Sequence, residues 1–290
     1  MDTKHGRRLL IALVALASLS TALADDSECK GPSADCVAVG SWSFALSLGA
    51  GVRTNPVVHQ SDIPLIVVPQ FSYYGKRFFI DNLDAGVTLL DGGAATLSLV
   101  ATPGYDRVFF YRSDLQNIFV GGFPTLSGQT PSGSGNSVES TQPAGRAQRF
   151  PARARAVTYL AGPEWTFKYH SISGQLDLLH EITGRDHGDE IRAALGMPLA
   201  ALAHGPLSAN IGITWKSAGI VNYYYGAPGI YDAGAVLDPF LKLAYVHPLG
   251  GKWKFTAFVE CERLGNAIAN SPIVNARYVT TTFVGTTYVF

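Results

Sequence analysis

Residues 42–53 read WSFALSLGAGVR, and this stretch decides the fold class. Every even position from Trp42 to Val52 carries an apolar side chain, whereas the odd positions are small or polar and end with Arg53. Because successive side chains of a strand point to opposite faces, this period of two predicts a β-strand with one apolar and one polar face.

The same alternation recurs in four later segments, at 175–178, 191–197, 207–216 and 253–260. In an exported β-sandwich the apolar face packs into the core, whereas in a membrane barrel it meets lipid and the polar face lines the lumen. Segments of about ten residues with aromatic side chains near their ends favour the barrel, because a tilted membrane-spanning strand needs ~9–11 residues.

Residues 1–24 are typical of a secretory signal peptide. Lys4 and two arginines precede a short apolar core, and Ala22-Leu23-Ala24 supplies small residues at the two positions that signal peptidase reads. The core is well short of the ~20 apolar residues of a membrane-spanning helix. We expect cleavage before Asp25, which leaves a periplasmic N-terminal segment at 25–41 and a mature net charge of about −2.

The composition excludes several functional classes. Charged residues make up 15% of the chain, against ~25% in an average soluble domain. No basic and aromatic surface suggests a nucleic-acid partner. The sequence contains no phosphate loop and no dinucleotide fingerprint, so we expect no cofactor.

These observations predict an antiparallel up-and-down transmembrane β-barrel of about 12 strands (10–12) over residues 42–290. The expected strands are 42–53, 62–74, 77–90, 95–102, 105–112, 154–169, 172–184, 189–200, 206–217, 236–247, 252–263 and 277–290. Longer links are expected at 54–61, 113–153, 218–235 and 264–276, with short links at Asp91–Gly93 and Arg185–Gly188. Tight turns are expected at Gly75-Lys76, Pro103-Gly104, Ser171, His204-Gly205 and Gly250-Gly251. Such alternation of short turns and long external loops is typical of outer-membrane barrels.

The C-terminus points to the same compartment. Gly285, Tyr288 and Phe290 have the spacing of the C-terminal signal that the barrel-assembly machinery recognises. Phe283 departs from that signal, which usually has a polar residue there. A sandwich whose last strand happens to end in phenylalanine is the alternative. We therefore expect a protein of the outer membrane of a Gram-negative bacterium, in contact with its lipid and lipopolysaccharide.

A set of short motifs spread over the expected barrel carries a family resemblance. They are Gly49–Val52, Pro56, Pro69, Tyr73–Gly75, Arg77–Asp81, Asn222–Gly226, Trp253 and, most specifically, the run RLGNAIANSPIV from Arg263 to Val274, followed by the terminal strand to Phe290. With these motifs the chain resembles the MipA/OmpV family of outer-membrane proteins. The loop at 113–153 matches nothing in the family pattern.

The resemblance implies a location in the outer membrane and, in some members, a structural role. There the barrel is a docking scaffold that brings a murein hydrolase, a lytic transglycosylase, to a peptidoglycan synthase. Other members resemble pores or stress-responsive surface proteins. We therefore expect a scaffold, with a small-solute channel as the alternative and a barrel enzyme as the least favoured class.

The register predicts which charged side chains line the lumen. Their signs are mixed, so no ring of one charge would select cations or anions. A salt-bridged, hydrated interior is the simpler interpretation, and a narrow pore is the alternative. The candidates are Arg53, Asp84, Glu164, Lys168, Asp177, Glu181, Arg192, Lys216, Lys242, Lys254, Glu260 and Glu262.

We expect no catalytic site and no metal site. Glu260 and Glu262 share one strand face, and paired carboxylates are able to do acid–base work, but same-face carboxylates are common in barrel lumens. His180 is expected on the lipid face or at a rim, and His187 in a loop. No His/Cys spacing is typical of a metal site.

The cysteines and the longest loop yield three further expectations. Cys29 and Cys36 lie close together in an oxidising compartment and are a possible disulfide. Cys261 falls on the apolar face and is expected to be a buried small hydrophobe. Four arginines at or after the end of the 113–153 loop are candidates to meet lipopolysaccharide phosphates, with a solvated strand terminus as the alternative: Arg146, Arg149, Arg153 and Arg155.

Overall fold

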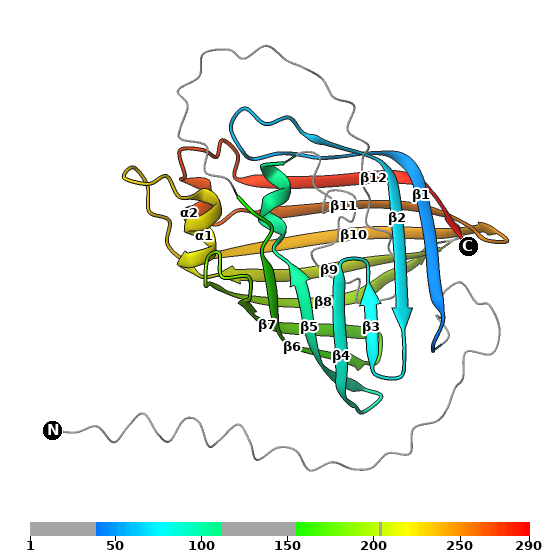
Figure 1. The fold of residues 1–290 in the computed structure, drawn as a ribbon. Coiled ribbons are helices and arrows are strands. Elements are labelled where there is room, and N and C mark those ends of the chain that lie inside the picture. Colours follow the sequence, from blue (N-terminus) through cyan, green and yellow to red (C-terminus); the bar gives the residue numbers. More distant parts are fainter. Residues whose placement is uncertain (1–38, 112–154, 203–204) are drawn as a thin grey trace.

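A computed structural model describes residues 39–111, 155–202 and 205–290. It contains twelve strands in the described part of the chain, joined into one closed antiparallel barrel in sequence order (Figure 1). The signal peptide, the segment before Val39 with Cys29 and Cys36, and the whole 113–153 loop lie outside the described residues. The strands are β1 Trp42–Arg53, β2 Ile63–Tyr74, β3 Phe78–Asp81, β4 Asp84–Asp91, β5 Ala95–Pro103, β6 Tyr159–Tyr169, β7 Ile172–Glu181, β8 Asp189–Leu202, β9 Gly205–Lys216, β10 Val236–Gly250, β11 Trp253–Arg263 and β12 Tyr278–Val289.

The two faces of β1 and of β9 have opposite chemistry. Trp42 is 52% exposed and Ile211 is 44% exposed on the outside, whereas Ser47 and Lys216 on the inside are 0% and 7% exposed. A sandwich would bury the apolar face, so this pattern excludes one and fits a barrel in lipid. No helix in the described part of the chain is long and apolar enough to span a membrane.

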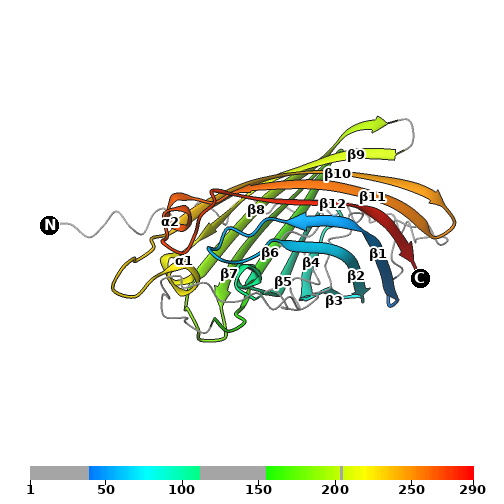
Figure 2. The same ribbon diagram turned by 90° about the horizontal axis from the view of Figure 1, so that it is seen from above.

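The two ends of the barrel differ. Links at 75–77, 92–94, 170–171 and 251–252 lie at one end, which we call the short-turn end, together with the first residues of β1 and the last of β12. The links at 54–62, 104–158, 182–188, 217–235 and 264–277 lie at the opposite, long-loop end, which also carries the described helices (Figure 2). The predicted segregation of long links to one end is thus seen.

Two predicted strands are wrong, and the errors compensate in the strand count. The segment 77–90 is two strands, β3 and β4, because Asn82 turns the chain with φ of 54° and its side-chain Oδ1 accepts the Phe71 N–H. Asparagine tolerates this left-handed conformation. The segment 105–112 is not a strand, since Tyr105–Phe109 forms the 3₁₀ helix η1. Pro103-Gly104 is accordingly no tight turn but the passage from β5 into η1.

The barrel closes where β1 pairs with β12, with Arg53 opposite Thr281 and Gly49 opposite Gly285. The two backbones are so close here that a Cβ on Gly285 would lie 2.4 Å from the Leu48 carbonyl oxygen and 2.7 Å from the Phe283 ring. Glycine is therefore required at this seam by packing. Gly285 is also part of the predicted assembly signal. Close packing between β1 and β12 requires glycine at this position independently of that prediction.

Candidate functional site

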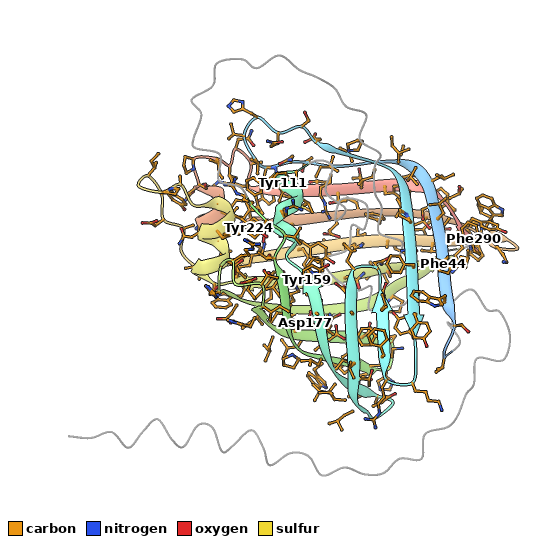
Figure 3. The ribbon with its side chains drawn as sticks, viewed as in Figure 1. Phe44, Tyr111, Tyr159, Asp177, Tyr224 and Phe290 are labelled. Carbon is orange, nitrogen blue, oxygen red and sulfur yellow. The ribbon has the colours of Figure 1, made fainter. Side chains whose placement is uncertain are left out.

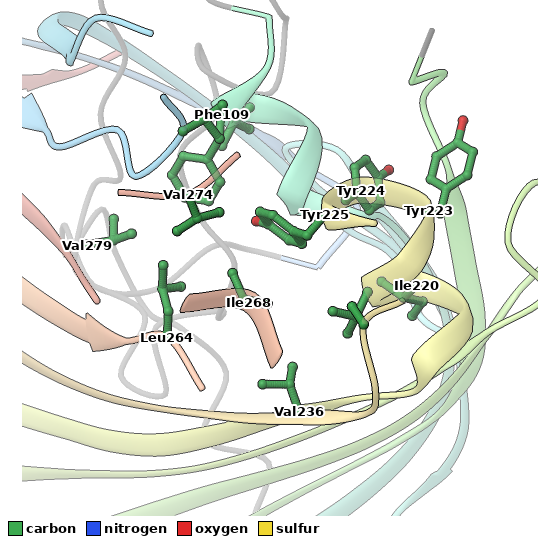
Figure 4. Packing of buried hydrophobic residues seen from close by; sticks show 14 of the residues in the cluster. Phe109, Ile220, Tyr223, Tyr224, Tyr225, Val236, Leu264, Ile268, Val274 and Val279 are labelled. Atoms are coloured by element: carbon green, nitrogen blue, oxygen red, sulfur yellow. The ribbon is translucent and has the colours of Figure 1, made fainter. Parts of the chain in front are cut away.

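The long-loop end of the barrel is filled by a plug, which we define as η1, α1 (Ala218–Tyr225) and α2 (Asn266–Ala269) with the loops around them. Figure 4 shows how the buried side chains of these elements pack together across the barrel mouth. Tyr224, Tyr225 and Ile268 are fully buried. The cluster also includes Leu160 and Leu179 from the inner faces of β6 and β7, so the plug is continuous with the barrel wall.

One buried cation attaches the plug to the wall. Lys216 at the end of β9 donates a hydrogen bond from Nζ to Asp106 Oδ1 of η1 over 2.8 Å, and its Nζ lies 3.4 Å from Asp238 Oδ2 of β10. Tyr225 of α1 donates to the same Asp106 oxygen over 2.8 Å. Asp238 Oδ1 in turn accepts the Gly265 N–H, 2.7 Å away, just before α2. We call these four side chains, Asp106, Lys216, Tyr225 and Asp238, the tether.

Backbone contacts complete the attachment. Ser271, after α2, donates to the Tyr225 carbonyl over 2.6 Å, and Arg155 Nε donates to the Tyr224 carbonyl over 2.7 Å. The Arg155 guanidinium also lies 4.0 Å from the centre of the Phe110 ring. Arg155 was a candidate to meet lipopolysaccharide phosphates, with a solvated strand terminus as the alternative, whereas these contacts place its guanidinium against the plug. Arg146, Arg149 and Arg153 lie outside the described residues.

The plug tyrosines remain neutral. Burial raises the pKa of Tyr225, and the nearby Asp106 carboxylate raises it further. Burial also raises the pKa of Tyr224 and of Tyr105. At physiological pH these hydroxyl groups are therefore protonated, which Tyr225 needs in order to donate to Asp106.

The predicted lumen residues occupy three kinds of position. Five are buried: Asp177, Glu181, Arg192, Lys216 and Lys242. Six are partly buried: Arg53, Asp84, Glu164, Lys254, Glu260 and Glu262. Lys168 has the inward register of Glu164 but is exposed at the short-turn end.

The inward charges form local partnerships, some within one strand and some across neighbouring strands. Arg192 Nε donates to Glu190 Oε1 over 2.5 Å, and Lys242 Nζ lies 3.6 Å from Glu260 Oε2. On the β6–β7 wall, Gln175 Nε2 donates to both Glu164 and Asp177 over 3.0–3.1 Å. Figure 3 places Asp177 on this wall, far from Phe44 and Phe290 at the short-turn end.

Glu181 has a different role from the other predicted lumen residues. Its carboxylate accepts the backbone N–H groups of Thr183 over 2.6 Å and Arg185 over 2.9 Å, and also the Thr183 hydroxyl. It therefore organises the link between β7 and β8 at the long-loop end.

Sequence reasoning missed four polar residues of this interior: Tyr105, Asp106, Glu190 and Asp238. Glu190 and Asp238 have the same inward register as Arg192 and Lys242, so the alternation already contained their signal. Asp106 and Tyr105 had no such signal, because their segment was taken for a strand.

A cavity of about 70 Å³ lies beneath η1 within the barrel. Its lining combines both signs of charge with an apolar side: Arg53, Tyr105, Asp106, Val108, Phe109, Glu190, Arg192, Thr214, Lys216, Phe240, Glu260 and Glu262. Below it, a second cluster of apolar side chains projects into the lumen from β2, β10, β11 and β12: Ile63, Leu65, Val68, Ala244, Phe258 and Phe283.

Of the residues considered for catalysis, Glu260 and Glu262 line the same cavity, whereas His180 lies on the outer face. His180 Nδ1 lies 2.7 Å from Asp189 Oδ1, but both side chains are on the outside and about 60% exposed. The described residues contain no group of His, Cys, Asp and Glu suited to hold a metal ion. Cys261 is a free thiol exposed on the outer face. The expectation that it is buried is wrong, because that face meets the surroundings of the barrel and not a protein core.

The family model for MltA-interacting protein MipA matches residues 46–290. The chain belongs to the MipA family. Two of the motifs that carried the resemblance have a place in this structure: Asn222–Gly226 forms the end of α1, and Arg263–Val274, the most specific one, forms α2 and its flanks. Both motifs of this MipA-family chain therefore build the plug.

Solved outer-membrane proteins are similar to this chain at low identity. An outer-membrane channel from Pseudomonas putida F1 is 8% identical with a TM-score of 0.41, and the match covers 91% of this chain and 100% of that one. OmpT with loop L8 deleted, from Vibrio cholerae, is 9% identical with a TM-score of 0.35, covering 87% and 100%. No curated protein matches the sequence. Its family and its own strand pairing show that this MipA-family chain is an outer-membrane β-barrel protein.

Proposed function

We propose that this protein is a closed, non-enzymatic barrel that acts as a structural docking platform in the cell envelope. The plug is the observation that carries the proposal. Apolar side chains fill the long-loop end and a second apolar cluster projects into the lumen below it. A permanently open pore would leave this volume to water.

Opening the barrel has a large energetic cost. Displacing η1 would separate Asp106 from Lys216, and both side chains are more than nine-tenths buried. Breaking a buried ion pair typically costs about 3–5 kcal/mol, because a buried charge loses its partner. Tyr224 and Tyr225 would also lose their burial. This cost supports a static barrel.

A small-solute channel is the second candidate. It is favoured by the polar inner face and by the cavity beneath η1. In this structure a continuous path would require the plug to move. The role of a stress-responsive surface protein stays a prediction from the family resemblance.

The short-turn end is the surface we propose for docking, since it faces the periplasm when the long loops face outward. Among the described residues of this end, four basic side chains and the acidic Asp91 are exposed; the basic ones are Lys76, Arg77, Lys168 and Lys252. Such an excess of cations attracts an acidic partner and steers its approach. The family is named for interaction with MltA, and we propose a murein hydrolase of that kind, together with a peptidoglycan synthase, as the partner class.

Export and assembly complete the proposal. Residues 1–24 would be removed as a signal peptide, and the barrel-assembly machinery would read the C-terminal strand. Tyr288 and Phe290 support this, because they lie on the outer side at the barrel end, with their ring centres 5.0 Å apart and Phe290 65% exposed. Three exposed arginines at the long-loop end are candidates for lipopolysaccharide phosphates: Arg185, Arg263 and Arg277.

Pull-down from envelope extracts tests the docking proposal. The wild-type barrel is expected to enrich murein hydrolases and synthases over an unrelated barrel of similar size. Reversing the charge of Lys76, Lys168 and Lys252 to glutamate should abolish this enrichment, because attraction becomes repulsion.

The matched control reverses the same number of charges at the opposite end, at Arg185, Arg263 and Arg277. This variant should retain the enrichment. Equal enrichment by wild type and by the short-turn variant would refute docking at this end, and no enrichment by wild type would refute the scaffold role.

A further inference from the structure

The cavity beneath η1 is a built site whose use is not explained by a structural role. It lies where the plug meets β1, β8, β9, β10 and β11. Solvent reaches its β11 side, since the Glu260 side chain is 25% exposed. Two charged side chains of its lining, Arg192 on β8 and Glu262 on β11, have polar atoms for which the described residues provide no hydrogen-bond or ion-pair partner.

The first group is Arg192 on β8, a side chain that is 4% exposed. Its Nε donates to Glu190 and its Nη1 donates to Thr102 over 3.4 Å. Its Nη2 is buried and has no hydrogen-bond partner in the part of the chain that the structure describes. A buried guanidinium nitrogen without an acceptor is costly, because it has lost water and gained nothing in exchange.

The second group is Glu262 on β11, which lines the same cavity. Lys242 lies beside the neighbouring Glu260, and Lys216 is engaged with Asp106 and Asp238. Within residues 39–111, 155–202 and 205–290, Glu262 has no basic nitrogen within the 4.0 Å of an ion pair. Among the described residues, the cavity thus combines, on β8, a buried N–H group without an acceptor, on a guanidinium that Glu190 already pairs, and on β11 a carboxylate without a cation in ion-pair distance.

We propose that this cavity binds a small zwitterion of the amino-acid class, with its carboxylate at Arg192 and its ammonium group at Glu262. A simple anion would leave Glu262 unpaired, and a simple cation would leave Arg192 Nη2 unpaired. Only a ligand with both charges satisfies both walls, and charge-assisted hydrogen bonds are the strong ones.

The size of the cavity limits the ligand. A volume of about 70 Å³ has room for a few water-sized groups, since one needs at least about 10–15 Å³, and glycine is among the smallest zwitterions. Val108, Phe109 and Phe240 close one side and leave no polar partner for a long side chain. The site therefore fits glycine or a molecule of similar size.

Equilibrium dialysis of radiolabelled glycine against the refolded full-length barrel in detergent micelles tests the proposal. Saturable binding at one site is expected. Unlabelled glycine should displace the label, whereas acetate and methylammonium, which each carry one of the two charges, should compete about tenfold less well, because each loses one charged contact.

Two variants identify the site. Arg192→Lys keeps the charge beside Glu190 but removes Nη2, and Glu262→Gln removes the carboxylate; each should weaken binding by about tenfold or more. Arg277→Lys, at the exposed rim, is the matched control and should bind like wild type. Resistance of the barrel to unfolding in sodium dodecyl sulfate shows that a variant is folded. If Arg192→Lys does not fold, the proposal is tested with Glu262→Gln alone.

Three results would overturn the proposal: absence of saturable glycine binding, competition by acetate or methylammonium as strong as by glycine, or unchanged binding in a folded Arg192→Lys or Glu262→Gln variant. None of them bears on docking at the short-turn end, which the pull-down tests separately.

Discussion

Replacing Lys216 by methionine is expected to be the most damaging single change to the plug. Methionine fills a similar volume, so the perturbation is loss of the charge. Lys216 is 9% exposed at its side chain, and its partners Asp106 and Asp238 are 4% and 0% exposed. The variant would leave two buried carboxylates without their cation.

The expected loss of unfolding free energy depends on the contacts that Asp106 and Asp238 keep. Breaking a buried ion pair costs about 3–5 kcal/mol. Asp106 keeps the Tyr225 hydroxyl and Asp238 keeps the Gly265 N–H, each as a hydrogen bond donor. These contacts offset part of the loss. We therefore expect Lys216→Met to lower the free energy of unfolding by about 3 kcal/mol, near the lower limit of that range.

Urea unfolding of the barrel in lipid vesicles, followed by tryptophan fluorescence, measures this loss. The four tryptophans all lie on barrel strands. Lys76→Met, at an exposed turn, is the control and should change stability by less than about 0.5 kcal/mol. The double variant Asp106→Asn with Lys216→Met should lose less unfolding free energy than the two single variants lose together, since the pair acts as a unit. A loss below about 1 kcal/mol for Lys216→Met would refute the tether.

Three further predictions concern other parts of the molecule. Gly285→Ala should destabilise the barrel by about 1–3 kcal/mol, because its Cβ would lie 2.4 Å from the Leu48 carbonyl; Gly234→Ala, which meets no atom within 4 Å, is the control, and equal urea midpoints would contradict the seam argument. Burial raises the pKa of Asp186, in the β7–β8 link, from 3.8 to about 6. Because the folded state holds this proton more tightly, stability from this group is present below about pH 4 and is lost as the pH rises to about 6. Asp186→Asn should remove this dependence of stability on pH. If the variant and the wild type show the same pH profile of unfolding, the role of Asp186 is refuted. Cys261 is exposed on the outer face, so in vesicles a membrane-soluble maleimide should modify it and a charged one should not; the reverse order of reactivity would place that face in water.

The alternation of side chains made the wall of the barrel predictable from the sequence. The period of two alone predicts the strands at Trp42 to Arg53 and Trp253 to Arg263. It also predicts that the charges of Lys216 and Lys242 point inward. Glu190 and Asp238 were open to the same argument. Local pattern and tertiary structure agree for these strands, because their outer face stays apolar over most of its length.

The plug was not predictable in this way. Val108, Phe109 and Phe110 have strong strand propensity, which context overrides: η1 is held by Asp106, whose partner Lys216 is distant in sequence. For residues 218–235 the sequence predicts only a link, whereas the structure forms α1 there; this helix has no side-chain hydrogen bond at its N-cap and is stabilised by packing. The motifs in 222–226 and 263–274 did mark these segments through the family resemblance, without indicating that they meet.

Single-channel recording in planar lipid bilayers tests the closed barrel most directly. The refolded wild-type protein should insert without steady conductance steps, because η1, α1 and α2 fill its outer mouth. Lys216→Met should show brief openings as the plug loosens. Steady, long-lived steps from the wild-type barrel would contradict the account and favour the channel.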